Sequence, residues 1–508
     1  MSIVSARFFI FAIIVLASYY IVPKNYRWIV LLFFSIGFYL LSNPKSFVFL
    51  LLSAITTYLS ANRIDKLNNN DDAKTKKIKK RILIVYLIAN FGLLLSFKYY
   101  GLFSHALSKL LDQPGLFSRL ALPLGISFYM FQSTGYVIDV YFGKVQSEKN
   151  FFKTFLFISF FPQIIQGPIH KFSFLHNQLI TGHSFNFDRL IQGFQLMIYG
   201  YFKKLVIADR IAIPVNYIFD INNNAEGFIV FLGAFAYSIQ IYADFSGGID
   251  ICRGFSQMLG ITLENNFKRP YFAESISEFW QRWHITLGSW MREYVFYPLA
   301  LSGLFTKVRK KLRNKNYRYL SKVVPTTLAS FVVYILVGIW HGSSFKFVAF
   351  GIYHGTIISI STLLENRYAL IKSRLKIRDN VFSYRLFKIV RTTFLVVIGR
   401  YFSRAARFLD VVVLYERTFK VWNPWVLADG SIYNLGLDKK DVRLLFIALI
   451  IMLVVSIYQE RGYKIRETLQ KQNYLFNICI TVLAILFILI FGHYGSGLGA
   501  SDFIYQGF

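Results

Sequence analysis

One stretch of this chain sets ionisable side chains within membrane-like sequence: Val337-Gly-Ile-Trp-His-Gly-Ser-Ser-Phe-Lys-Phe-Val-Ala-Phe-Gly-Ile-Tyr-His-Gly355. Its two histidines, His341 and His354, are costly in hydrocarbon, so each needs either buried partners or a functional role. The ordinary imidazole pKa of about 6.5 suits such a residue to take and return a proton. Gly342 and Gly355 follow them and leave room for another backbone or a substrate. We interpret the stretch as a candidate site, with His341 ahead of His354; packing between helices is the alternative.

The composition of the whole chain indicates a membrane protein. Of its 508 residues, 55% are hydrophobic and 16% are charged, whereas soluble domains carry about 25% charged residues. Apolar runs long enough to span a bilayer recur at 8–22, 29–41, 47–59, 82–97, 326–340, 444–458 and 478–491. The sequence lacks the alternating pattern of barrel strands. We therefore predict an all-α polytopic membrane protein, with one integral membrane domain over residues 1–508.

The net charge of +31 comes from lysines and arginines in short loops between the apolar runs. These basic stretches are 63–81, 307–322, 367–378 and 461–471. The positive-inside rule explains them as cytoplasmic loops, so we expect a lipid bilayer as partner and no nucleic acid. Two cysteines, Cys252 and Cys479, support neither a disulfide framework nor a metal cluster, and we expect both in the core.

Two apolar stretches are interrupted by proline and glycine. They are Leu122-Pro-Leu-Gly-Ile-Ser-Phe-Tyr129 and Phe160-Phe-Pro-Gln-Ile-Ile-Gln-Gly-Pro-Ile169. Irregular backbone at membrane depth persists only where it is buried in protein or lines a cavity. We expect the first stretch to break or kink a helix. For the second, a cavity wall, a re-entrant turn and a simple loop all remain open.

Carboxylates interrupt the apolar stretch Gln240-Ile-Tyr-Ala-Asp-Phe-Ser-Gly-Gly-Ile-Asp250. By their cost in hydrocarbon, Asp244 and Asp250 should face a partner or water. Arg253 follows Asp250 by three residues, so the two can pair on one helix face. This pairing and a catalytic role remain equally open.

The stretch from Glu278 to Tyr294 predicts one amphipathic helix. Its apolar stripe at three- and four-residue spacing consists of Trp280, Trp283, His284, Leu287, Trp290, Met291 and Tyr294. Glu278 and Arg282 form an i,i+4 pair off this stripe. A buried histidine among tryptophans is structural unless another titratable group faces it, and His341 is the candidate to face His284.

The position of His341 along its helix favours a role on the outer side of the membrane. If the basic loop 307–322 is cytoplasmic, the helix over 323–342 runs outward, and at 1.5 Å per residue His341 lies about 27 Å along it. Motifs for phosphate, dinucleotide, metal or nucleophilic serine chemistry are absent from the sequence. A histidine without a nucleophile indicates general-base catalysis on a hydroxyl that attacks an activated acyl group.

The chain carries the motifs Trp340-His341-Gly342, Tyr353-His354-Gly355, Arg282-Trp283-His284, Asp244-Phe-Ser-Gly247, Leu122-Pro-Leu-Gly-Ile-Ser-Phe128, Phe161-Pro-Gln163 with Gly167-Pro-Ile169, and Phe503-Ile-Tyr505. Together they resemble the membrane-bound O-acyltransferase family, most closely its bacterial branch of alginate O-acetylation proteins and teichoic acid D-alanyl transferases. The resemblance implies a helix bundle with a central funnel or tunnel and re-entrant or amphipathic helices. It also implies a donor from the cytoplasm, an acceptor from outside, and catalytic roles for His341 and His284. Gln166, Gly248 and the tail residues Gln506-Gly507 depart from the family pattern.

From this resemblance we expect transfer of an acetyl group from a cytoplasmic thioester, acetyl-CoA or an acyl carrier protein, to hydroxyls of an exported polysaccharide. Transfer would be direct or through an extracytoplasmic acetyltransferase partner, in a bacterial cell membrane, with no tightly bound cofactor and no metal. His341 would act as base, His284 would assist, and Asp244, Trp340 and His354 would contact substrate. The alternatives are D-alanyl transfer to teichoic acid and a transporter with ion sites at Asp244, Asp250 and Glu278. Against a transporter, the sequence has no recognisable inverted halves.

Overall fold

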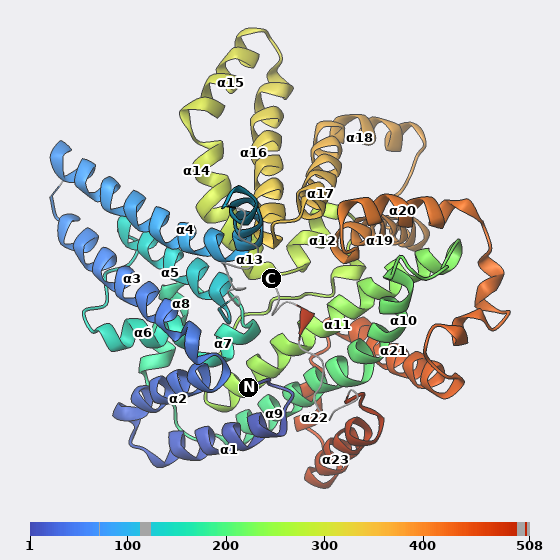
Figure 1. The fold of residues 1–508 in the computed structure, drawn as a ribbon, viewed down its shortest axis with the longest axis horizontal. Helices are drawn as coiled ribbons and strands as arrows, with labels where there is room; N and C mark the ends of the chain where they lie inside the picture. The colour runs from blue at the N-terminus through green and yellow to red at the C-terminus, as the bar shows by residue number, and fades with distance from the viewer. Residues whose placement is uncertain (71, 112–122, 495–502, 505–508) are drawn as a thin grey trace. The chain divides into compact units, whose positions relative to one another are not determined.

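The computed structural model describes residues 1–70, 72–111, 123–494 and 503–504 (Figure 1). Leu122 and, in the C-terminal tail, Tyr505, Gln506 and Gly507 lie outside these residues. Within them the regular structure is helical, with an isolated antiparallel bridge between Phe267 and Trp283 and no strand. The prediction of an all-α protein is confirmed.

Within the part of the chain that the structure describes, seven helical segments are long and apolar enough to cross a membrane. They are Lys24–Ser42, Pro44–Leu67, Ala73–Tyr100, Phe228–Met258, Arg318–His341, Lys439–Glu460 and Tyr474–Phe491. An eighth is possible if α17 (Phe345–Leu363) and α18 (Glu365–Arg374), which meet at 58°, count as one broken span. The chain is therefore polytopic, as predicted.

Two expectations about these segments need correction. Sequence run 8–22 forms α1 (Ala6–Ile21), whose 16 residues are short for a span. Residues 240–250 lie inside the 31-residue α11 (Phe228–Met258), where Asp244 and Asp250 face cationic partners as expected. Cys252 is buried as expected, but Cys479 is exposed on the apolar surface of α23 (Tyr474–Phe491).

The chain forms two compact units that alternate along the sequence. The first comprises Met1–Asp209, Ala243–Asn265 and Ile457–Phe508; the second comprises Arg210–Tyr242 and Asn266–Ser456. The expectation of one acyltransferase domain over 1–508, and of a central funnel, stays a prediction.

In the first unit, the proline- and glycine-rich stretches are buried breaks between helices. Gly125 has φ 66° and precedes α5 (Ile126–Tyr141); a methyl group added to it would lie 2.4 Å from the carbonyl oxygen of Ile164. Glycine is needed there for both the left-handed backbone and the close approach. The break thus falls before α5, where the sequence indicated it.

The second break separates α6 (Phe151–Ser159) from α7 (Phe161–Gln166), and it is enclosed by protein. Buried glutamines satisfy the freed carbonyls: Gln132 Nε2 donates to Phe157 O at 2.7 Å, and Gln163 Nε2 donates to Pro168 O at 2.9 Å. Gln132 and Gln163 therefore cap backbone carbonyls near this break.

In the second unit, α16 (Arg318–His341) and α17 pack as an antiparallel pair and lie side by side in Figure 1. Glycines bring the two backbones together: a methyl group at Gly338 would lie 2.4 Å from Phe347 O, and one at Gly351 would lie 2.3 Å from Tyr334 O. Small residues are the usual means of close helix packing in membranes. This pairing fixes the turn that carries His341.

Candidate active site

His341 is the last residue of α16, directly before the turn at Gly342. Its imidazole is half-buried and stacks on Phe347, with ring centroids 5.9 Å apart and planes 25° apart. Phe350 approaches edge-on at 5.9 Å. The ring is thus held by aromatic side chains while part of it stays accessible, as a group that exchanges protons with a substrate requires.

His284 lies at a break in what the sequence predicted to be one amphipathic helix. That prediction is wrong: α12 (Ile276–Arg282) ends before Trp283, and α13 (Ile285–Met291) begins after His284. Trp283 is extended, and His284 has φ 46°, in the left-handed region that non-glycine residues rarely adopt.

A neighbouring extended segment, Asn266–Lys268, causes this break. Lys268 N donates to Arg282 O at 2.9 Å, and Ile285 N donates to Asn266 O at 3.0 Å. These bonds replace the helical bonds that the backbone would otherwise make across Trp283 and His284. Because the segment is distant in sequence, helical periodicity could not reveal it. Strained backbone of this kind concentrates at functional sites.

The side chain of Asn266 also holds the start of α13. Its Oδ1 accepts from Thr286 N and Thr286 Oγ1, both at 3.0 Å, and lies 3.2 Å from His284 Nδ1. Asn266 is fully buried and His284 is 3% exposed. Burial lowers the pKa of His284 to about 3, so its imidazole is neutral over the physiological range.

Trp340 brings the two predicted catalytic histidines into one neighbourhood. Its ring centroid lies 4.7 Å from that of His341 and 6.3 Å from that of His284. The indole is 7% exposed and is packed near both imidazoles. His341 was predicted to face His284; in the structure both rings contact Trp340.

His354 occupies a different environment, in the middle of α17. It is 1% exposed, and its ring lies 4.6 Å from Phe350, 5.0 Å from Tyr353 and 5.0 Å from Trp280 of α12. On another side it abuts Gly399 of α19 (Phe382–Arg404), where an added methyl group would lie 2.7 Å from His354 Nε2. Its surroundings are those of a packing residue, and substrate contact by His354 stays a prediction.

Asp244 belongs to the first unit, within α11. Its Oδ1 accepts from Lys204 Nζ at 2.8 Å, and Lys204 also pairs with Asp209 at 2.9 Å. The backbone N–H of Ile504 donates to Asp244 Oδ2 at 2.9 Å, and the Phe503 ring lies 4.4 Å from Lys204 Nζ. Asp244 therefore sits in a buried ionic cluster, and its contact with substrate stays a prediction.

The lysines that organise this cluster were not predicted from the sequence. Lys203 and Lys204 follow one another in the apolar stretch 201–208. Charged side chains are costly in hydrocarbon, and this cost could have indicated that both lysines need buried carboxylate partners. Lys203 Nζ lies 2.6 Å from Asp250 Oδ2, which adds to the predicted bond between Arg253 and Asp250 at 3.3 Å.

The predicted pair of Arg282 with Glu278 is also present, at 2.7 Å. Each carboxylate that a transporter would use as an ion site thus has a cationic partner: Asp244 has Lys204, Asp250 has Lys203 and Arg253, and Glu278 has Arg282.

Gln166 and Gly248, two departures from the family pattern, lie against each other in the first unit. A methyl group added to Gly248 would lie 1.7 Å from Gln166 Oε1, so the glutamine side chain occupies the space that any side chain at position 248 would need. Gln166 is fully buried. The two departures are therefore one structural feature, in which a large residue is accommodated by a small one.

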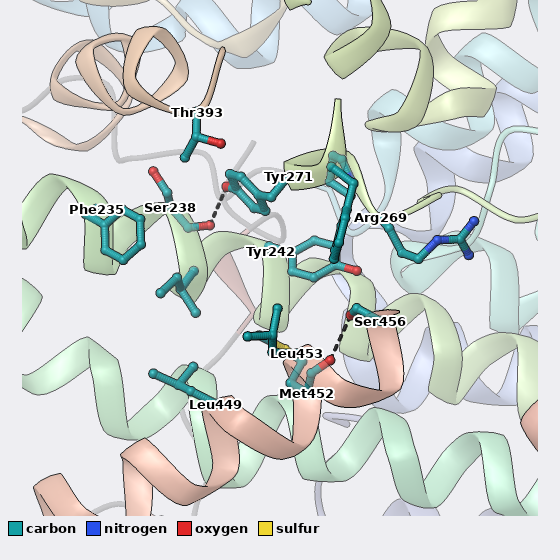
Figure 2. A pocket seen from close by; sticks show the side chains of 13 residues that line it. Phe235, Ser238, Tyr242, Arg269, Tyr271, Thr393, Leu449, Met452, Leu453 and Ser456 are labelled. Atoms are coloured by element: carbon teal, nitrogen blue, oxygen red, sulfur yellow. Dashed lines mark hydrogen bonds between the residues drawn. The ribbon is translucent and has the colours of Figure 1, made fainter. Parts of the chain in front are cut away.

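A cavity of about 330 Å³ lies in the second unit, between α11, the turn Pro270–Phe272, α19 and α21 (Lys439–Glu460) (Figure 2). Two of its hydroxyls are engaged in the wall: Tyr271 Oη donates to Ser238 O at 2.6 Å, and Ser456 Oγ donates to Met452 O at 2.7 Å. In Figure 2 the guanidinium of Arg269 points away from the other labelled side chains. Tyr242 connects this apolar cavity to Trp283, at 6.3 Å, beside His284.

Comparisons with known proteins identify the family of the chain. The profile of the membrane-bound O-acyltransferase family matches residues 28–399. The probable alginate O-acetylase AlgI of Pseudomonas aeruginosa is 31% identical over 446 residues, which cover 87% of this chain and 79% of that protein. The peptidoglycan O-acetyltransferase of Helicobacter pylori is 30% identical, over 66% of this chain and 63% of that protein. The teichoic acid D-alanyltransferase of Bacillus subtilis is 26% identical, over 48% and 59%. The chain belongs to the membrane-bound O-acyltransferase family and is a polytopic O-acyltransferase.

Proposed function

We propose that the protein transfers an acetyl group from a cytoplasmic thioester to hydroxyls of an exported cell-surface polysaccharide. The observation that carries this proposal is the half-buried His341 at the end of α16, held by Phe347 and joined through Trp340 to His284. Relatives named as O-acetylases of alginate and peptidoglycan support acetyl as the acyl group and a polysaccharide as the acceptor.

In the proposed reaction, His341 removes the proton of the acceptor hydroxyl as its oxygen attacks the thioester carbonyl carbon. The new C–O bond forms, the C–S bond breaks, and the proton passes from the imidazolium of His341 to the departing thiolate. The products are the acetyl ester and the free thiol. General-base assistance of this kind contributes about 10²–10⁴-fold to a rate. His284 stays neutral and orients the reacting groups.

The donor is proposed to be acetyl-CoA or an acetylated carrier protein, a co-substrate that is released after each turnover. Basic stretches such as 307–322 support an anionic donor on the cytoplasmic side, because clustered lysines and arginines attract it. Asp244, Trp340 and His354 remain the proposed substrate contacts. We place the protein in the bacterial cell membrane, where it would hand the acetyl group to the polymer directly or to an extracytoplasmic acetyltransferase.

D-alanyl transfer to teichoic acid is the second candidate. The D-alanyltransferase of Bacillus subtilis supports it, but the similarity covers about half of this chain at 26% identity. The O-acetylase relatives cover more of the chain at higher identity.

Mass analysis of the surface polymer tests the proposal. Cells lacking the protein should lose alkali-labile acetate from the polymer, and the wild-type gene should restore it. His493→Ala should restore it as well, because the backbone N–H of His493, which the substitution retains, makes its bond to Leu205 O. Release of alanine in place of acetate would favour D-alanylation, and an unchanged polymer would refute both candidates.

A further inference from the structure

We propose that Asn266 is a positioning residue that fixes which ring nitrogen of His284 carries the proton. In this role Asn266 holds the proton on Nδ1 and leaves the Nε2 lone pair as the reactive face. The inference rests on the proposed function, because it concerns the histidine that assists His341. It concerns a residue that none of the family motifs quoted above includes.

The hydrogen bonds of Asn266 identify its two amide atoms. A backbone N–H can only donate, so the atom 3.0 Å from Thr286 N must be the amide oxygen. The Thr286 hydroxyl donates to the same oxygen at 3.0 Å. His284 Nδ1 lies 3.2 Å from this oxygen, which has no proton to give. Nδ1 must therefore carry the hydrogen.

The state of Nε2 follows from the same geometry. Burial keeps the imidazole of His284 neutral, so the ring carries one proton, and Asn266 assigns that proton to Nδ1. Nε2 then has a lone pair and can accept a hydrogen bond but cannot donate one. His284 is therefore suited to hold the acceptor hydroxyl by its proton, or to accept a hydrogen bond from another donor in the site.

The residue type at position 266 matters because a carboxylate there would also accept from Nδ1. An aspartate would stabilise the charged imidazolium, since an opposite charge in contact raises a histidine pKa by about 1–3 units. The uncharged amide leaves the ring in the neutral state that burial sets. It does so although no described residue accepts from Asn266 Nδ2 in this fully buried position, and an unmade buried bond costs about 1–3 kcal/mol.

Among the residues that the structure describes, charged neighbours do not set the protonation state of His284. On α16 the neighbouring titratable group is His341, next to Trp340. On the segments that flank His284, Lys268 is exposed and Arg282 is paired with Glu278 at 2.7 Å. Burial is what lowers the pKa of His284, so a change at position 266 acts directly on its imidazole.

The test is the pH dependence of acetyl transfer by the purified full-length Asn266→Asp variant, with acetyl-CoA as donor and an oligosaccharide of the surface polymer as acceptor. We expect kcat to gain an additional acidic ionisation between about pH 4 and 6, where a His284 pKa raised from about 3 by about 1–3 units lies. Transfer relative to wild type should fall by up to about 10-fold at pH 5 and recover toward wild type at pH 9, with KM for the donor unchanged.

Two matched variants isolate this effect. Asn265→Asp places the same charge on the exposed neighbouring residue, and Thr286→Val removes the other side-chain donor to the same oxygen. Both should keep the wild-type profile. A wild-type profile for Asn266→Asp, or an equal shift in either matched variant, would overturn the proposal.

A measurement without turnover covers the case in which Asn266→Asp fails to fold. In protein labelled with ¹⁵N-histidine, the His284 signal is identified by its loss in His284→Gln. Nitrogen shifts of an Nδ1–H, neutral ring support the assignment, and those of an Nε2–H or doubly protonated ring overturn it. If wild-type protein shows the expected ring but transfers no acetyl group, the proposed function fails while this assignment stands.

Discussion

Two triplets of the same pattern, Trp340-His341-Gly342 and Tyr353-His354-Gly355, have different surroundings in the fold. His341 ends α16 and is half-buried, whereas His354 lies within α17 and is 1% exposed. Gly342 forms a turn after its histidine, while Gly355 continues a helix. The same local sequence thus yields an accessible imidazole at a helix end and an enclosed one between helices.

The comparison shows that a histidine in apolar sequence becomes reactive through its place on the helix. At a helix end, a ring can rest on aromatic neighbours on one face and meet a substrate on another. In mid-helix, contacts from α12 and α19 surround the ring of His354. Substitutions in the His354 triplet should therefore mainly lower stability, and substitutions of His341 should mainly lower activity.

The largest effect on stability is expected from Trp340→Ala. The indole is 7% exposed and contacts both His341 and His284, so its removal should cost about 3–5 kcal/mol and also lower transfer by folded protein. Trp422→Ala is the matched control, because Trp422 is 70% exposed. Thermal unfolding in detergent measures both; equal shifts would show that Trp340 does not join the site.

His354→Ala should come next, with a loss of about 2–5 kcal/mol from the cavity left among Phe350, Tyr353 and Trp280. The amount of folded protein should fall, while the rate per folded molecule should change far less than in His341→Ala. A stable His354→Ala protein with abolished transfer would reverse the roles of the two triplets.

Gly399→Ala tests the enclosure of His354 from the other side. The new methyl group would lie 2.7 Å from His354 Nε2, and such overpacking costs about 1–3 kcal/mol. Gly92→Ala on α4 (Ala73–Leu111) is the control, because a methyl group there meets open space. Combining Gly399→Ala with His354→Ala should relieve the clash; strictly additive losses would contradict the contact.

The smallest effect on stability is expected for His341→Gln. The half-buried ring contributes stacking on Phe347 at the end of its helix, so its replacement should cost about 1 kcal/mol or less. Unfolding in detergent measures this change. A loss comparable to that of His354→Ala would show that His341 is a packing residue like its counterpart.

Hydrophobicity predicted the helical class, and six of the predicted apolar runs lie in helices able to span a membrane. The family motifs drew attention to His341, Trp340 and His284. Contacts between segments distant in sequence could not be predicted. Helical spacing could not show that the segment at Asn266 breaks the helix at His284, because the bonds between these two segments compete with a locally favourable helix.

The ionic cluster around Lys204 and Asp244 was not predicted for the same reason. Lys204 and Asp244 are 40 residues apart, and each looked isolated in apolar sequence. By contrast, the pairs Asp250–Arg253 and Glu278–Arg282 were predicted correctly, because three- and four-residue spacing on a helix fixes their contact.

The most direct test of the account compares acetyl transfer by purified His341→Ala and wild-type protein at equal amounts of folded enzyme. Loss of the base should lower kcat by about 10²–10⁴-fold with little change in unfolding temperature. A rate within a few-fold of wild type would contradict the assignment of His341 as the base.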